Sequence, residues 1–311
     1  MIKFNQNFKI EKYHIKLFFV SYILIFILFF VLVFVIENTS FKKKELIIIK
    51  KIYKKYDQRL YKFFLLKNSE PNTLIMGTSS ALVFDPAFLD EYGKNSINLA
   101  FPAGKISEYY DFIKYTIENK KNIKEIIIEL KHYSFTDIEF NSAQPVIISN
   151  NKLKAYFDLI NTKNYKFYLE ILYYYFKSFV ANTDNDENNY FFSTGLRNYS
   201  SSKQELINQK PVEFTGKFNE DEYKKLIQIK LLCEKNKINL VLFFGPITDT
   251  QKNFKNNKFI NKEKKLIKKL RNDFSNIYDF KYFEKDIQGN FYDHIHYDYD
   301  IAKLIIKKIY N

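Results

Sequence analysis

Residues 71–311 alternate between two hydrophobic patterns. Short continuous apolar runs, typical of strands buried on both faces, are separated by segments with apolar residues at helical spacing. The predicted strands are 73–76, 96–100, 124–130, 238–244 and 276–280. The predicted helices are 106–120, 221–236, 263–272 and 298–310. This order predicts an α/β domain with a mainly parallel sheet between helices, and such sheets bind ligands at the carboxyl ends of their strands.

Residues from about 140 to 218 interrupt this alternation. Segment 164–180 is rich in Tyr and Phe and predicts a helix, and segment 182–189 is a polar loop. A helical insertion of this size between two core strands is often a lid or a partner surface. The chain has no internal repeat and no Gly/Ser-rich linker, so we expect the insertion to belong to the same domain.

A different pattern precedes the domain. Residues 17–36 form an uncharged apolar run of 20 residues, broken only by Ser21 and Tyr22. A helix of this length crosses the hydrocarbon core at about 1.5 Å per residue. A cleaved signal peptide has a shorter apolar core that ends in small residues, and Ile36-Glu-Asn-Thr-Ser40 is a poor cleavage site. We therefore predict that residues 1–40 hold one uncleaved transmembrane anchor.

Lysines flank the predicted span on both sides and leave its orientation open. The larger number after the span favours a cytoplasmic domain, but large domains translocate largely regardless of charge. Residues 41–70 follow as a basic amphipathic stalk, in which 45–67 has helical spacing. This helix either packs on the domain or lies on lipid headgroups. Its Tyr and Phe residues favour packing on the domain.

Composition narrows the functional classes. The net charge is +14, but the lysines are spread along the whole chain, as on a solvated surface. No helix-turn-helix, RNA-binding or zinc-finger pattern accompanies them, so we expect no nucleic-acid partner. Cys233 is the only cysteine and is predicted to be a small buried apolar residue.

A serine stands on the predicted turn after the first strand, in Thr73-Leu-Ile-Met-Gly-Thr-Ser-Ser80. Gly77 allows a tight turn, and the serines begin a short predicted helix that Asp85-Pro86 interrupts. Backbone N–H groups at a helix start lack helical partners and can hold an oxyanion. Ser79 or Ser80 can also be an ordinary N-cap.

A second candidate group, Asp293-His-Ile-His296, precedes the last predicted helix. Asp293 and His296 are three positions apart, so both side chains can lie on the same side of one turn. The carboxylate can then orient imidazole Nδ1 and leave Nε2 to deprotonate a serine hydroxyl. His294 is expected to point elsewhere.

Metal binding is the competing interpretation of this motif. His132 is the only histidine of residues 71–311 outside it, and a zinc site usually takes three or four ligands. We therefore predict neither a metal nor another cofactor.

Three motifs together resemble the SGNH (GDSL-like) hydrolase superfamily. They are strand-Gly77-Thr-Ser79, then Asn98-Leu-Ala-Phe-Pro-Ala-Gly104 at the next strand end, and Asp293-x-x-His296 before the last helix. The resemblance spans residues 71–311 in order and spacing. It extends to the membrane-anchored members, which include proteins resembling those that O-acetylate alginate or act in teichoic acid D-alanylation.

The resemblance implies a flavodoxin-like three-layer α/β/α sandwich and a role for each matched residue. Ser79 corresponds to the nucleophile, and Asp293 and His296 correspond to the other triad members. The N–H groups of Ser79 and Gly104 correspond to the oxyanion hole.

One position departs from the family pattern. The family often has an Asn in a Gly-x-Asn-Asp string after the third strand, whereas this chain has Glu129-Leu-Lys-His-Tyr133. Lys131 or His132 is a candidate to replace this Asn as a hydrogen-bond donor to the oxyanion. The alternative is an oxyanion hole formed by two backbone N–H groups alone. Losing one oxyanion donor typically costs about 10²–10³ in rate, so the departure bears on activity rather than on fold.

The sequence thus predicts a membrane-anchored serine esterase or O-acyltransferase, with an acyl donor or acylated cell-envelope glycan as substrate. The resemblance places the anchor in the inner (cytoplasmic) membrane and the domain on the extracytoplasmic side. A multi-spanning membrane acyltransferase is a candidate partner beside the lipid bilayer. The alternative is a weakly active or inactive scaffold that binds a glycan or such an acyltransferase.

Overall fold

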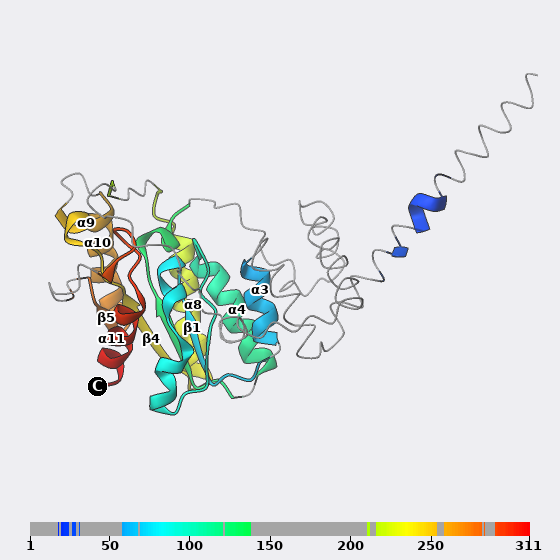
Figure 1. Cartoon of the computed structure of the whole chain (residues 1–311), viewed down its shortest axis with the longest axis horizontal. Helices are drawn as coiled ribbons and strands as arrows, with labels where there is room; N and C mark the ends of the chain where they lie inside the picture. The colour runs from blue at the N-terminus through cyan, green and yellow to red at the C-terminus, as the bar shows by residue number, and fades with distance from the viewer. Residues whose placement is uncertain are drawn as a thin grey trace, which may run out of the picture.

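The computed structural model describes residues 58–67, 69–120, 122–137, 210–211, 216–253, 258–281, 283 and 290–311, with residues 18, 20–24, 27–28 and 31. In this part of the chain, five parallel strands form one sheet with the order β2-β1-β3-β4-β5 (Figure 1). This is the order of flavodoxin-like doubly wound sheets. The strands are β1 (Thr73–Met76), β2 (Ser96–Asn98), β3 (Glu125–Glu129), β4 (Asn239–Phe244) and β5 (Ile277–Asp279).

Helices connect the strands. The α-helices are α3 (Gln58–Lys67), α4 (Ile106–Asn119), α8 (Glu220–Lys235), α9 (Asp249–Asn253), α10 (Lys258–Asp273) and α11 (Tyr299–Tyr310). Three short 3₁₀ helices are also described. Between β1 and β2 lie η1 (Ser79–Val83) and η2 (Pro86–Tyr92), and η3 (His132–Phe135) follows β3. In Figure 1, α3, α4 and α8 lie on one side of the sheet and α11 lies on the other.

The sheet separates two apolar cores, because successive strand side chains point to opposite faces. Ile126 and Ile128 face the core built with α3, α4, α8 and α10. Ile127, between them, faces the core built with η1, η2 and α11. Parallel register places Ile127 beside Ile75 of β1 and Val241 of β4, which are also buried. Continuous apolar strands are therefore required by burial on both faces.

Most predicted elements are confirmed, with differences at their ends. The strand predicted over 96–100 ends at Asn98, whose side-chain amide turns to donate to the carbonyls of Ala81 and Phe84 at 2.8 and 2.9 Å. Helix α10 begins at Lys258 rather than at residue 263, and α9 was not predicted.

Cys233 is buried, as predicted, and burial raises the pKa of its thiol to about 12. The predicted insertion at 140–218 and the stalk residues before Gln58 lie almost entirely outside the described residues. The described residues include no helix with the length and apolar character needed to cross a membrane. Most of the predicted span 17–36 also lies outside them.

Candidate active site

Ser79 stands at the carboxyl edge of the sheet, immediately after β1. The chain leaves Met76, turns at Gly77 with φ of 155° and enters η1 at Ser79. A Cβ at Gly77 would lie 2.6 Å from Ala81 Cβ and 2.9 Å from Glu129 Cβ, so only glycine fits this close turn. The turn therefore holds the Ser79 hydroxyl at the end of the strand, next to the carboxyl end of β3.

His296 lies in the histidine loop, defined here as residues 290–298. The Tyr292 N–H donates to the carbonyl of His296 at 2.8 Å, and the Asp298 N–H donates to that of Asn290 at 2.8 Å. Asp298 also caps α11 by accepting from the backbone of Asp300 and Ile301. These bonds close the loop and anchor it to the start of the last helix.

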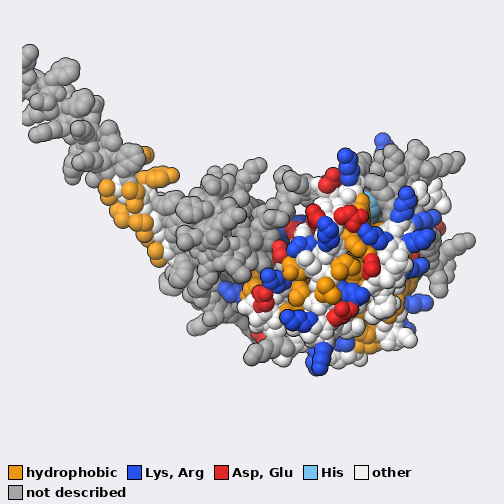
Figure 2. Space-filling model, turned by 180° about the vertical axis from the view of Figure 1, so that it is seen from behind, with side chains coloured by type: hydrophobic (Ala, Val, Ile, Leu, Met, Phe, Trp, Pro, Cys, Tyr) orange, Lys and Arg blue, Asp and Glu red, His pale blue; other side chains and the backbone are white. Residues whose placement is uncertain are grey.

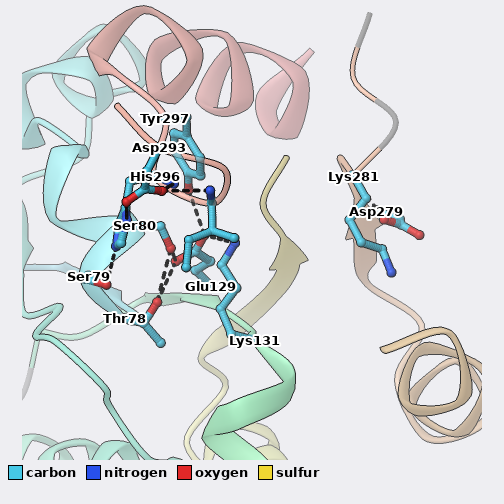
Figure 3. A network of polar contacts seen from close by, with 11 residues as sticks. Thr78, Ser79, Ser80, Glu129, Lys131, Asp279, Lys281, Asp293, His296 and Tyr297 are labelled. Atoms are coloured by element: carbon cyan, nitrogen blue, oxygen red, sulfur yellow. Dashed lines mark hydrogen bonds and ion pairs between the residues drawn. The ribbon is translucent and has the colours of Figure 1, made fainter. Parts of the chain in front are cut away.

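A chain of hydrogen bonds joins Ser79, His296 and Asp293 (Figure 3). Ser79 Oγ lies 2.6 Å from His296 Nε2, and His296 Nδ1 lies 2.5 Å from Asp293 Oδ2. The side chains of His296 and Asp293 are 21% and 34% exposed, so the group is reachable from solvent. The structure thus brings together three predicted residues in the geometry that activates a serine hydroxyl.

The other carboxylate oxygen of Asp293 holds the loop. Its Oδ1 accepts from the backbone N–H groups of Ile295 and His296, both at 2.8 Å. Burial raises the pKa of the Asp293 carboxyl, but the hydrogen bond and charge of His296, with these two backbone donors, outweigh burial and lower the pKa overall. Asp293 is therefore held as a carboxylate that orients Nδ1.

Asp293→Asn is expected to lower the melting temperature near neutral pH and to have little further effect in acid. Because the pKa of Asp293 is lower in the folded protein, the carboxylate stabilises the fold fully above its unfolded pKa of about 3.9. That stabilisation is lost as the pH falls through the lower folded value. Thermal melts of both proteins from about pH 7 to pH 3 should show converging melting temperatures, and a constant difference would contradict this assignment.

The loop at residues 98–104 runs beside the serine turn. Asn98 is fully buried and accepts from the Ala100 N–H at 2.9 Å, while the Phe101 N–H donates to the Gly77 carbonyl at 3.2 Å. Ala103 then adopts a left-handed conformation with φ of 54°, just before Gly104. The Phe101 hydrogen bond thereby ties this loop to the turn between β1 and Ser79.

Two basic side chains of α3 hold this loop from outside. Lys62 is buried and donates to the Asn98 carbonyl at 2.7 Å. The Arg59 guanidinium lies 4.6 Å over the Phe101 ring, donates to the Pro102 carbonyl at 3.3 Å and pairs with Glu108. The last part of the predicted stalk helix therefore contacts the segment that carries Gly104.

Gly104→Ala is expected to lower kcat for an ester substrate by about 10²–10³-fold, the cost of one oxyanion donor. A Cβ at Gly104 would lie 2.7 Å from Cε1 of Tyr109 and still closer to its hydroxyl. Tyr109 is fully buried, so the loop must move and take the Gly104 N–H with it.

Steady-state rates with p-nitrophenyl acetate test this expectation, with Gly93→Asn as the matched control. A Cβ at Gly93 meets nothing within 4 Å, and Asn tolerates the left-handed backbone there. Native turnover by Gly104→Ala would show that the Gly104 N–H is not a donor.

The two candidate replacement donors lie beyond β3. Lys131 is buried, with Nζ 3.3 Å from Oε1 of Glu129, and His132 is buried at the start of η3. Their role toward an oxyanion stays a prediction. His294 is buried and contacts Thr248, with Nδ1 2.9 Å from Thr248 Oγ1, whereas His296 contacts Ser79.

Sequence reasoning missed several residues around the site, chiefly Glu129, Tyr297, Arg59 and Lys62. Glu129 looks like a solvated strand end, and Arg59 and Lys62 look like the solvated face of a helix. Tyr297 lies in the loop before the last helix, where the sequence pattern carries no signal for it. Among the residues that the structure describes, no three His, Cys, Asp or Glu side chains are grouped to hold a metal ion.

Three solved structures resemble the chain at low identity. One is a Streptococcus pneumoniae protein provisionally described as a platelet activating factor; it has 12% identity and a TM-score of 0.42, covering 89% of this chain and 97% of its own. A provisionally assigned acylhydrolase of Bacteroides fragilis has 13% identity and a TM-score of 0.37, covering 81% and 94%. A GDSL-like lipase of Bacteroides thetaiotaomicron has 12% identity and a TM-score of 0.37, covering 81% and 96%.

Likeness at this level assigns neither a family nor a reaction. No family model matches the sequence, and no curated protein matches it.

Proposed function

We propose that the protein is a serine esterase or O-acyltransferase that works through an acyl-enzyme on Ser79. The observation that carries this proposal is the continuous hydrogen-bonded chain from Ser79 through His296 to Asp293. The hydrogen-bonded chain lies at the carboxyl edge of the sheet, beside the neighbouring strands β1 and β3. From this point β2 extends the sheet on one side, and β4 and β5 extend it on the other. Ligands bind at this place in doubly wound sheets.

In the first step, His296 Nε2 takes the proton of the Ser79 hydroxyl as Oγ attacks the carbonyl carbon of an ester. Asp293 stabilises the resulting imidazolium through Nδ1–H and keeps the ring in place. The N–H groups of Ser79 and Gly104 donate hydrogen bonds to the former carbonyl oxygen and stabilise its negative charge. His296 then protonates the leaving alcohol as the carbon–oxygen bond breaks, which leaves an acyl group on Ser79.

The second step reverses the first with a new nucleophile. His296 takes a proton from water or from an acceptor hydroxyl as that oxygen attacks the acyl carbon. His296 then returns the proton to Ser79 Oγ as the bond between Oγ and the acyl carbon breaks. Water gives hydrolysis, and a sugar hydroxyl gives O-acyl transfer. Both reactions use the same residues, so the acceptor decides between them.

We infer that the substrate is an acylated cell-envelope glycan and that residues 17–36 anchor the chain in the inner membrane, with the domain on the extracytoplasmic side. In support, the described residues of this segment are helical, and their large apolar side chains are each more than half exposed (Figure 2). Lipid would cover such side chains. A multi-spanning membrane acyltransferase would supply the acyl group if the reaction is transfer.

A pre-steady-state burst tests the proposal. The full chain in detergent, mixed with p-nitrophenyl acetate, is expected to release close to one equivalent of p-nitrophenolate before steady turnover. Mass spectrometry of the quenched protein should place the acetyl group on Ser79. Absence of both the burst and steady turnover in folded protein would favour the non-catalytic scaffold.

A further inference from the structure

Glu129 is a fully buried carboxylate beneath the candidate site. It is the last residue of β3 and has no exposed surface. Burying a carboxylate is costly unless it is paired and hydrogen-bonded. Its partners therefore indicate why the chain keeps a charged group in this place.

Both oxygens of Glu129 bind neighbours of the triad (Figure 3). Oε2 accepts from Ser80 Oγ at 2.5 Å and from Thr78 Oγ1 at 3.4 Å, the two residues that flank Ser79. Oε1 accepts from the Tyr297 hydroxyl at 2.9 Å, and Tyr297 directly follows His296. One carboxylate thus connects the serine turn with the histidine loop.

The backbone around Glu129 is shaped to admit this carboxylate. Gly245, directly after β4, leaves space that a Cβ would fill: that atom would lie 2.8 Å from Cε1 of Tyr297 and closer still to Glu129 Oε1. Gly77, directly after β1, also leaves space for Glu129, because a Cβ there would lie 2.9 Å from Glu129 Cβ. Lys131 supplies the opposite charge, with its Nζ 3.3 Å from Oε1.

We propose that Glu129 is a positioning residue that sets the distance between Ser79 Oγ and His296 Nε2. The two residues come from segments more than 200 positions apart, and their contact of 2.6 Å needs a rigid link between those segments. Short hydrogen bonds to a carboxylate are about twice as strong as neutral ones. Glu129 provides such a link on both sides while touching neither reacting atom. This inference rests on the proposed serine chemistry.

Glu125 offers a matched control, because it has the same side chain on the same strand at the opposite end of the sheet. It is buried and binds Asn239 Nδ2 at 2.6 Å, Lys94 Nζ at 3.1 Å and the Tyr310 hydroxyl. A role in stability alone predicts similar effects for Glu125 and Glu129. A positioning role predicts an effect on the chemical step for Glu129 only.

The experiment compares Glu129→Gln with Glu125→Gln in the full chain, using p-nitrophenyl acetate well below either melting temperature. Glu129→Gln is expected to lower kcat by about 10–100-fold, the cost of a small misplacement, with KM changed by less than about twofold. Glu125→Gln should lower the melting temperature while keeping kcat within about twofold of the native value. Equal losses of kcat in both variants would overturn the inference.

A second variant distinguishes loss of positioning from loss of stability. Glu129→Gln leaves the buried Lys131 ammonium unpaired, so the double variant Glu129→Gln with Lys131→Met removes both charges. It should recover stability while its kcat stays well below that of Lys131→Met alone, the variant that carries any effect of losing Lys131 as a donor. Equal kcat in these two variants would overturn the positioning role. The proposed function fails separately, if Ser79→Ala turns over substrate at the native rate.

Discussion

Ser79→Ala is expected to lower kcat for p-nitrophenyl acetate by about 10⁴–10⁶-fold, the range seen when a triad serine is removed. The reason is direct: no other atom can take the place of Oγ, which lies 2.6 Å from His296 Nε2. Without it, only binding and oxyanion stabilisation remain to assist attack by water. The melting temperature should hardly change, because Ser79 is at a half-buried turn.

Ser69→Ala serves as the control for this variant. Ser69 is also half-buried just after α3, and its hydroxyl donates to the Leu65 carbonyl of that helix at 2.8 Å. Loss of that bond should leave turnover unchanged. A Ser79→Ala protein that retains even a tenth of the native rate, about 1.4 kcal/mol in activation free energy, would remove Ser79 from the mechanism.

His296→Ala is expected to cause a loss of similar size, about 10⁴–10⁶-fold in kcat. Its imidazole is the group that contacts both Ser79 and Asp293, so its removal leaves Oγ without a base. Residues that act as one unit are not additive, and the double variant with Ser79→Ala should be no slower than either single variant.

Adding imidazole to the assay distinguishes loss of the base in His296→Ala from loss of the nucleophile in Ser79→Ala. A small base can enter the space left by the His296 side chain, which is 21% exposed, and partly restore turnover. It should restore nothing in Ser79→Ala. Equal rescue of both variants, or multiplied losses in the double variant, would contradict a joint mechanism.

The strands and the later helices could be predicted because burial demands a simple pattern. Strand β4 is buried from Val241 to Phe244 and is apolar throughout that part, and α11 begins after a capping Asp298. Ser79, Asp293 and His296 could be identified because strand ends and loop motifs carry local signals. Their contact across the sheet edge depends on topology, which the same pattern of strands and helices predicts.

Glu129 and the basic residues of α3 could not be identified in this way. A glutamate at either end of Glu125-Ile-Ile-Ile-Glu129 looks like a strand leaving the core, yet both are buried. Lys62 looks like one of many solvated lysines, but it donates to a buried carbonyl. Their partners are distant in sequence, and hydrogen bonds between distant segments leave no periodic trace along the chain.

Labelling of the full chain with a fluorophosphonate, which reacts covalently with activated serines, tests directly whether Ser79 is an activated nucleophile. Peptide mapping is expected to find the adduct on Ser79, with no adduct in Ser79→Ala and slow labelling in His296→Ala. Folded native protein that carries no adduct on Ser79 under conditions that label a control esterase would contradict the assignment of Ser79 as an activated nucleophile.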